Sequence, residues 1–315
     1  MKRTLSHELG LILGGAILGI VGPDLTKFLP STVWSTFGLT VLSLGLILYG
    51  FAIPQSVFRT VVRGVRTWQW RTPRIGILGG LASTAGDGIG AVNTDIPAIE
   101  WLEEIRKASV RRGVSVNVKL IPALTSFDSF DAVINPFGAT YPEASFQDFP
   151  VYTRLLEYVR EGGLFINAAD IPTYFAFNAN LNRSIDRTPA AYDISGRPVR
   201  FFSRVPLMEE LAVRVINCQN VGAVSVAILS QFASCGSPPA SLVITRAAIV
   251  EGNVKSVLAP LTIGRYTATP LFFCPYGDGQ VLCSLSWLSG QYASNNSLVP
   301  FLADVIIHAI TSGRN

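Results

Sequence analysis

The chain has 315 residues, enough for one large domain or two smaller ones, and its formal net charge is +4. Charged residues make up 15 % of the chain and the mean hydropathy is +0.39, whereas an ordinary globular chain carries about 25 % charged residues. This deficit of charge indicates that part of the chain lies in lipid. No run of Lys and Arg is interleaved with aromatic residues, which argues against nucleic acid as a partner.

Two apolar segments near the start predict a transmembrane helical hairpin over residues 1–54. Leu9–Gly22 is uncharged but short, and Val33–Ile53 is a longer segment without a charge. The second segment can cross a hydrocarbon core of about 30 Å, whereas the first needs snorkelling ends or an extension toward Phe28. Whether the first segment crosses fully stays open. A cleaved signal peptide is the alternative for it, but no small-x-small cleavage site is evident.

The charges around the two segments predict their orientation. Lys2 and Arg3 precede the first segment, and several arginines follow the second, with no acidic residue before Asp87. By the positive-inside rule, both termini face the cytoplasm and the chain is an integral protein of the inner, or cytoplasmic, membrane.

Small residues along both predicted spans favour close packing of the two helices. In the first span they form two GxxxG pairs, Gly10 with Gly14 and Gly15 with Gly19. In the second span the glycines predicted to pack are Gly38 and Gly45.

Residues 55–73 predict an amphipathic helix at the cytoplasmic interface of the membrane. Valines recur toward one side of this segment, and arginines and tryptophans surround them. Tryptophan suits headgroup depth and arginine suits anionic lipid, although a docking helix for a partner subunit is the rival interpretation. The residues predicted to contact the membrane are Arg59, Arg63, Arg66, Trp68 and Trp70.

From residue 74 onward, strands alternate with helices and predict a cytoplasmic α/β domain over residues 74–315. Repeated β-α units with continuous apolar strands are typical of a mostly parallel, flavodoxin-like sheet flanked by helices. The predicted strands are 74–80, 114–123, 130–138, 164–170, 223–230, 241–250, 256–264 and a hairpin within 269–287, and the predicted helices are 96–112, 149–163 and 298–310.

The motifs "FDAVINPFGATYPE", "YVREGGLFINAAD" and "YGDGQVLCSLSW" occur in that order. Together they resemble class I glutamine amidotransferase-like domains, especially the ThuA-like and β-galactosidase-trimerisation-like branches. The resemblance covers about residues 75–315, with a less conventional insert at 175–222. It implies a nucleophile elbow, G-x-C-x-G, after the strand at 164–168, but this chain has "NAADIPTY" there. Asp170 stands at the turn, and neither His7 nor His308 is placed to serve as a base, so the resemblance is to a degenerate member without catalytic residues.

Polar residues at the expected carboxyl edge of the sheet are the candidate ligand site. They are Asp87, Asn135, Glu143, Asn167, Asp170 and Tyr174. The carboxylates could instead act as general acid and base or hold a metal with the asparagines. Helix capping and turn formation are the structural alternatives. The glycine-rich segment 79–91 fits a dinucleotide fingerprint poorly because its match starts several residues after the strand. We therefore expect no cofactor and no metal.

The sequence predicts a membrane-anchored, non-catalytic domain that acts as a scaffold or accessory subunit. Its expected partners are the lipid bilayer and either other membrane-protein subunits or further copies of itself. A membrane-bound metabolite sensor is one alternative. A hydrolase or transferase that uses Asp170 and Glu143 is the other.

Overall fold

The computed structural model describes only part of the chain. The described residues are 72–79, 94, 96–122, 127–187, 192–193, 200–202, 205–218, 222–288 and 290–312. The two predicted spans with their glycines, the five residues predicted at the membrane interface and Asp87 lie outside these ranges. No helix within the described ranges combines the length and the apolar character needed to cross a bilayer.

The described part is built on a seven-stranded sheet with the order β14-β17-β18-β5-β3-β1-β2. The five strands from β18 to β2 pair in parallel, whereas β17 and β14 are antiparallel additions at one side. The strands are β1 (Arg74–Gly79), β2 (Asn117–Pro122), β3 (Ala132–Asn135), β5 (Leu164–Asn167), β14 (Lys255–Ser256), β17 (Leu271–Tyr276) and β18 (Gly279–Ser284). The prediction of a mixed α/β domain with a mostly parallel sheet is confirmed.

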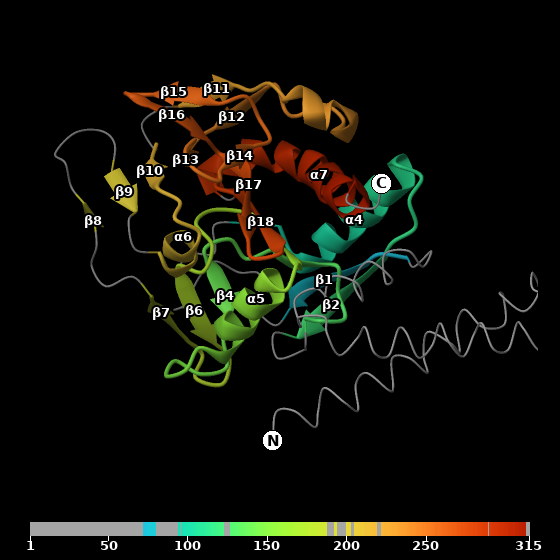
Figure 1. Ribbon diagram of the computed structural model, residues 1–315, viewed down its shortest axis with the longest axis vertical. Helices are drawn as coiled ribbons and strands as arrows, with labels where there is room; N and C mark the ends of the chain where they lie inside the picture. The colour runs from blue at the N-terminus through green and yellow to red at the C-terminus, as the bar shows by residue number, and fades with distance from the viewer. Residues whose placement is uncertain are drawn as a thin grey trace, which may run out of the picture. The chain divides into compact units, whose positions relative to one another are not determined.

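Helices and a small sheet bury both faces of this central sheet (Figure 1). One face packs against α4 (Ala98–Arg111) and α7 (Leu298–Ser312). The other packs against α5 (Pro150–Arg160) and α6 (Pro206–Glu210) and a three-stranded sheet, β4-β6-β7. Those three strands are β4 (Thr140–Pro142), β6 (Phe175–Asn178) and β7 (Arg183–Asp186). Burial on both faces explains why β3 and β5 read as almost continuous apolar runs.

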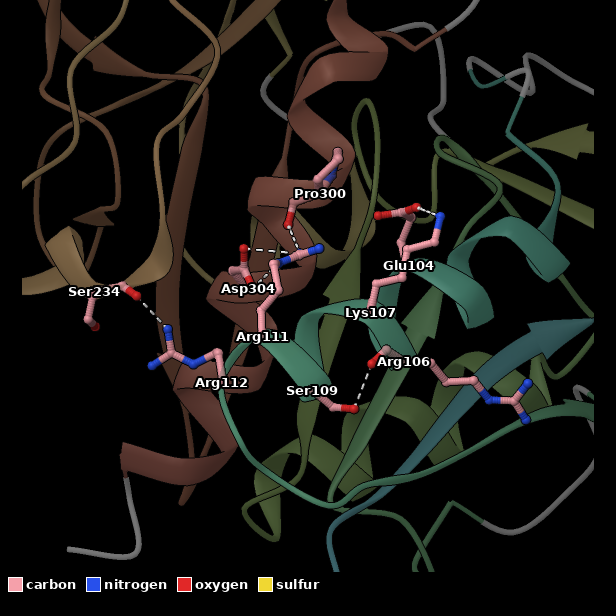
Figure 2. A network of polar contacts seen from close by, with 9 residues as sticks. All are labelled: Glu104, Arg106, Lys107, Ser109, Arg111, Arg112, Ser234, Pro300 and Asp304. Atoms are coloured by element: carbon pink, nitrogen blue, oxygen red, sulfur yellow. Dashed lines mark hydrogen bonds and ion pairs between the residues drawn. The ribbon is translucent and has the colours of Figure 1, made fainter.

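The packing of α4 against α7 fixes one layer of the domain. On α4, Trp101 and Ile105 are fully buried in the shared core. At the end of α4, Arg111 forms an ion pair with Asp304 of α7, with 3.1 Å between Nη2 and Oδ2, and also donates to the carbonyl oxygen of Pro300 (Figure 2). The buried face of α4 is therefore committed to the core, and its opposite face points to solvent.

A second, antiparallel sheet of six strands was not expected from the sequence. Its order is β15-β16-β13-β10-β9-β8. The strands are β8 (Tyr192–Asp193), β9 (Arg200–Phe202), β10 (Val215–Asn217), β13 (Arg246–Ile249), β15 (Leu261–Ile263) and β16 (Tyr266–Thr269). Two further strands, β11 (Ala223–Ser225) and β12 (Ser241–Val243), pair with each other, and two 3-10 helices are η1 (Ser230–Cys235) and η2 (Gly290–Ser297).

The strand predicted over 241–250 is divided at Ile244–Thr245, so the prediction of one strand there is wrong. The Thr245 carbonyl accepts from the Cys218 amide at 2.7 Å, and the Thr245 hydroxyl donates to the Leu285 carbonyl at 3.2 Å. The first bond extends the β10–β13 ladder by one residue pair, whereas residues 241–243 pair with β11. β12 and β13 therefore belong to different sheets.

The hairpin predicted within 269–287 is formed by β17 and β18, and it turns at Gly277–Asp278. Gly277 has φ +61°, a conformation that favours glycine. The Asp278 amide donates to the Arg160 carbonyl at 2.9 Å, so the turn lies against the end of α5. Gly279 lies against backbone as well, because a Cβ there would fall on the carbonyl oxygens of Val159 and Gly163.

We predict that Gly279→Ala lowers the free energy of unfolding by about 1–3 kcal/mol, since overpacking against backbone cannot be relieved by a side-chain rotation. Gly79→Ala is the matched control, because a Cβ at Gly79 meets only the Ile121 carbonyl oxygen at an ordinary 3.7 Å. Chemical denaturation of both variants and the unaltered chain measures the difference. Equal losses in the two variants would contradict the close approach.

Candidate functional site

Two asparagines lie side by side at the carboxyl edge of the parallel sheet. Asn135 ends β3 and Asn167 ends β5, and the two strands pair in register at these residues. Asn135 Nδ2 donates to Asn167 Oδ1 at 2.8 Å and lies 3.0 Å from the Thr140 carbonyl oxygen. Asn167 Nδ2 donates to the Ala169 and Asp170 carbonyl oxygens at 2.7 and 2.9 Å. Both side chains are fully buried, and they shape the loops that leave the two strands.

The turn after β5 adopts a backbone conformation that is uncommon for residues other than glycine. Asp170 has φ +55° and Thr173 has φ +59°. Aspartate tolerates this left-handed region better than most residues, because its short side chain can form local hydrogen bonds. The two bonds from Asn167 hold the turn in place. The turn presents the Asp170 side chain to the interior, where it is fully buried.

A buried ion pair joins this turn to the second sheet. Asp170 Oδ1 contacts Nη1 of Arg246, the first residue of β13, and the Arg246 side chain is 12 % exposed. The Arg246 guanidinium also lies over the Trp287 ring, 5.3 Å from its centroid. Burial lowers the pKa of Arg246 to about 9, which still leaves the guanidinium protonated at neutral pH. The pair is therefore a carboxylate and a guanidinium that neutralise each other in the core.

Glu143 has a structural role at the start of α5. Its Oε1 accepts from the Ala144 and Val151 amides at 2.7 and 3.0 Å, and its Oε2 accepts from the Tyr152 amide at 3.1 Å. The residue before the helix, Phe149, makes no side-chain cap. The Glu143 carboxylate thus takes the place of an N-cap and lies at the positive end of the helix dipole.

Tyr174 lies in an aromatic cluster formed by the loops around α5. Its ring lies 4.5 Å from that of Phe175, and its carbonyl oxygen accepts from the Arg187 amide at 3.0 Å. The Arg187 guanidinium in turn stacks on Phe149 and Tyr152, at 4.2 and 4.0 Å from the ring centroids. Such contacts combine apolar burial with cation–π attraction. These aromatic side chains therefore pack within the chain itself.

The structure brings together three of the predicted site residues, namely Asn135, Asn167 and Asp170. Glu143 is engaged with α5 and Tyr174 with the aromatic cluster, and Asp87 lies outside the described residues. Sequence reasoning missed Arg246 and Trp287. The available signal was a single arginine within the apolar run 241–250, because a buried guanidinium requires a counterion.

The cysteines and His308 belong to other parts of the domain. All four cysteines are unpaired and buried, and burial raises the pKa of Cys218 to about 12 and that of Cys274 to about 11. Their thiolate forms are therefore scarce at neutral pH. His308 on α7 contacts Arg112 at 3.2 Å, and its pKa is lowered by burial and by that arginine. Among the described residues, no three His, Cys, Asp or Glu side chains gather in a metal-binding arrangement.

We predict that Asp170→Asn lowers the free energy of unfolding by about 3–5 kcal/mol, because it leaves Arg246 buried without a counterion. Asparagine also tolerates a positive φ, so the variant removes charge with little effect on the backbone. Arg246→Met should cost a similar amount. The double variant should lose clearly less than the sum of the two, as denaturant titration can measure. Additive losses would show that the two charges do not interact.

Comparison with known proteins identified structures of similar architecture but no family. No protein-family model matches the chain, and no curated protein matches its sequence. A β-galactosidase from Rahnella sp. R3 aligns over 75 % of this chain and 32 % of its own, with 16 % identity and a TM-score of 0.44. A β-galactosidase from Bacillus circulans sp. alkalophilus aligns over 77 % and 31 %, with 10 % identity and a TM-score of 0.46.

A ThuA-like protein from Bacteroides uniformis aligns over 75 % of this chain and 91 % of its own, with 11 % identity and a TM-score of 0.38. The matched region is about a third of each β-galactosidase. With each of these TM-scores below 0.5, the similarity assigns neither a family nor an activity to the chain.

Proposed function

We propose that this chain is a membrane-anchored, non-catalytic α/β domain that serves as a scaffold or accessory subunit of a membrane protein complex. The observation that carries the proposal is the state of Asp170, the residue at the position of a nucleophile elbow. It is fully buried and ion-paired with Arg246. A nucleophile or general base must reach its substrate, whereas this carboxylate is committed to holding two sheets together.

The second candidate carboxylate supports the same conclusion. Each oxygen of Glu143 accepts at least one backbone amide at the start of α5. Withdrawing the Glu143 side chain for catalysis would leave buried amides without acceptors, at about 1–3 kcal/mol each. A hydrolase or transferase based on Asp170 and Glu143 would therefore have to dismantle two structural contacts before reacting. This cost favours the non-catalytic role over the enzymatic alternative.

The order of the parallel strands supports a flavodoxin-like fold. Taken in chain order, the parallel strands β1, β2, β3, β5 and β18 are arranged 2-1-3-4-5 across the sheet. This is the flavodoxin-like arrangement, in which ligands bind beyond the carboxyl ends of the strands. We regard the domain as a degenerate amidotransferase-like domain whose elbow has become a structural turn. The anchor to the membrane is inferred from the uncharged segments at 9–22 and 33–53 and the arginines that follow them.

A metabolite sensor is the second candidate, and one observation favours it. Near the same edge of the sheet, the hydroxyl groups of Thr173, Ser284 and Ser286 are buried without a hydrogen-bond partner. Buried polar groups in native proteins are nearly always satisfied by protein, ordered water or ligand. A small polar molecule that binds beside the Asp170–Arg246 pair would satisfy them.

We expect the full chain, extracted from its native membrane in a mild detergent, to elute with a fixed set of partner proteins. Size exclusion followed by mass spectrometry of the intact complex identifies what travels with it. A lone chain that carries a small molecule in place of protein partners would favour the sensor.

Protection from protease in sealed vesicles tests the predicted orientation of the anchor. In sealed, right-side-out vesicles, added protease should leave residues 74–315 intact, because the positive-inside rule places them in the interior. Cleavage within those residues in intact vesicles would show that the predicted topology is wrong. Vesicles opened with detergent serve as the control for protease activity.

A further inference from the structure

Helix α4 carries an exposed stripe of four residues on the side away from the core. The residues are Ile99, Glu103, Arg106 and Val110, and we call them the outer stripe. Their spacing of four, three and four residues places them on one face of a helix. Val110 is 80 % exposed and Ile99 is 50 % exposed, and they are two of the four large apolar residues exposed in the described part of the chain. An apolar residue thus lies at each end of the stripe.

The two charged residues between them are available for contacts outside the chain. Some other charges on α4 already have partners. Lys107 pairs with Glu104 at 2.6 Å, and Arg111 pairs with Asp304. By contrast, among the described residues the side chains of Glu103 and Arg106 form no ion pair or hydrogen bond, and Glu103 acts on Lys107 only through its charge. Figure 2 shows the Arg106 side chain directed away from the Arg111–Asp304 pair.

The order of residues in the outer stripe is self-complementary. Consider a second α4 that lies antiparallel to the first, with the two-fold axis between residues 104 and 105. The numbers of two residues that face each other across this axis then add up to 209. Ile99 then faces Val110 of the partner subunit, and Glu103 faces Arg106 of the partner subunit. The symmetry repeats both contacts. Both apolar ends are covered and both charges are paired in a single register.

We propose that the outer stripe is the contact surface of a two-fold dimer of this chain, formed by antiparallel packing of α4 against α4. The four–three–four spacing is that of the seam of a coiled coil, which lets side chains of one helix insert between those of the other.

A second copy fits this surface better than a bilayer does. An anionic lipid surface would attract Arg106 but repel Glu103 at the centre of the stripe, whereas a second α4 satisfies both. A helix of 14 residues is about 21 Å long, so the contact is small and the dimer should be weak in dilute solution. If the chain is anchored as proposed above, confinement to a membrane raises the effective concentration of the copies. The dimer itself does not depend on that anchor.

Charge reversal tests the register. Glu103→Arg and Arg106→Glu each place two like-charged pairs across the axis, so each should weaken the dimer by about tenfold or more. The double variant, E103R with R106E, restores both pairs in reverse and should recover the dimer. Arg265→Glu, a charge reversal at an exposed residue of the β15–β16 turn, is the control and should have no effect. Sedimentation velocity of the full chain in mild detergent, over a range of concentrations, gives the dissociation constants.

Cross-linking tests the direction of packing. A mixture of Ile99→Cys and Val110→Cys copies should form a disulfide-linked dimer under mild oxidation. Either variant alone should not, because identical positions lie about 16 Å apart along the antiparallel pair. The four native cysteines are buried and should not contribute. A monomeric chain at all concentrations, a dimer that survives both single charge reversals, or cross-linking of either variant with itself would overturn the proposal.

Discussion

A buried carboxylate meets a buried guanidinium where the turn after β5 reaches the first residue of β13. Each charge would be costly in the interior without the other, so the two sheets must stay together for either residue to be tolerated. The asparagine pair at the ends of β3 and β5 fixes the backbone of that turn and thereby aims Asp170 at Arg246. The arrangement of the two sheets follows from this one contact and from the hydrophobic core that surrounds it.

The parts of the fold that could be predicted from sequence are those determined by local pattern. β1, β3 and β5 are short apolar runs, α5 stops at the Gly162–Gly163 pair, and the last hairpin turns at glycine. The six-stranded sheet could not be predicted, because its strands have two to four residues and its central pairing joins Val215 to Ala248, 248 − 215 = 33 positions later. The division of 241–250 at Ile244–Thr245 follows from pairing with two different strands, β11 and β10, which no local pattern reveals.

For the candidate site, the sequence predicts where polar residues gather but not the chemical role of each one. Sequence placed Asn135, Asn167 and Asp170 at one sheet edge, because parallel strands end together there, and Asn167 does contact both of the others. The partner that decides the role of Asp170 comes from a strand more than 70 positions later, and the aromatic ring over it, that of Trp287, follows β18. The sequence also placed Glu143 at this edge, yet its carboxylate is engaged by the backbone amides at the start of α5. The type and position of a residue suggest that it belongs to a site, whereas its hydrogen-bond partners determine what it can do chemically.

The parallel sheet is also completed late. Leu164 of β5 pairs with Gln280 of β18, and these residues are 280 − 164 = 116 positions apart. Ribosomes add about 5–20 residues per second, so the open edge of β5 waits roughly 6 to 23 seconds for its neighbour during synthesis. An unpaired edge of apolar sequence is a template for pairing with the wrong chain. A newly made copy therefore depends on the arrival of the last hairpin, or on a chaperone that occupies its place, to escape aggregation.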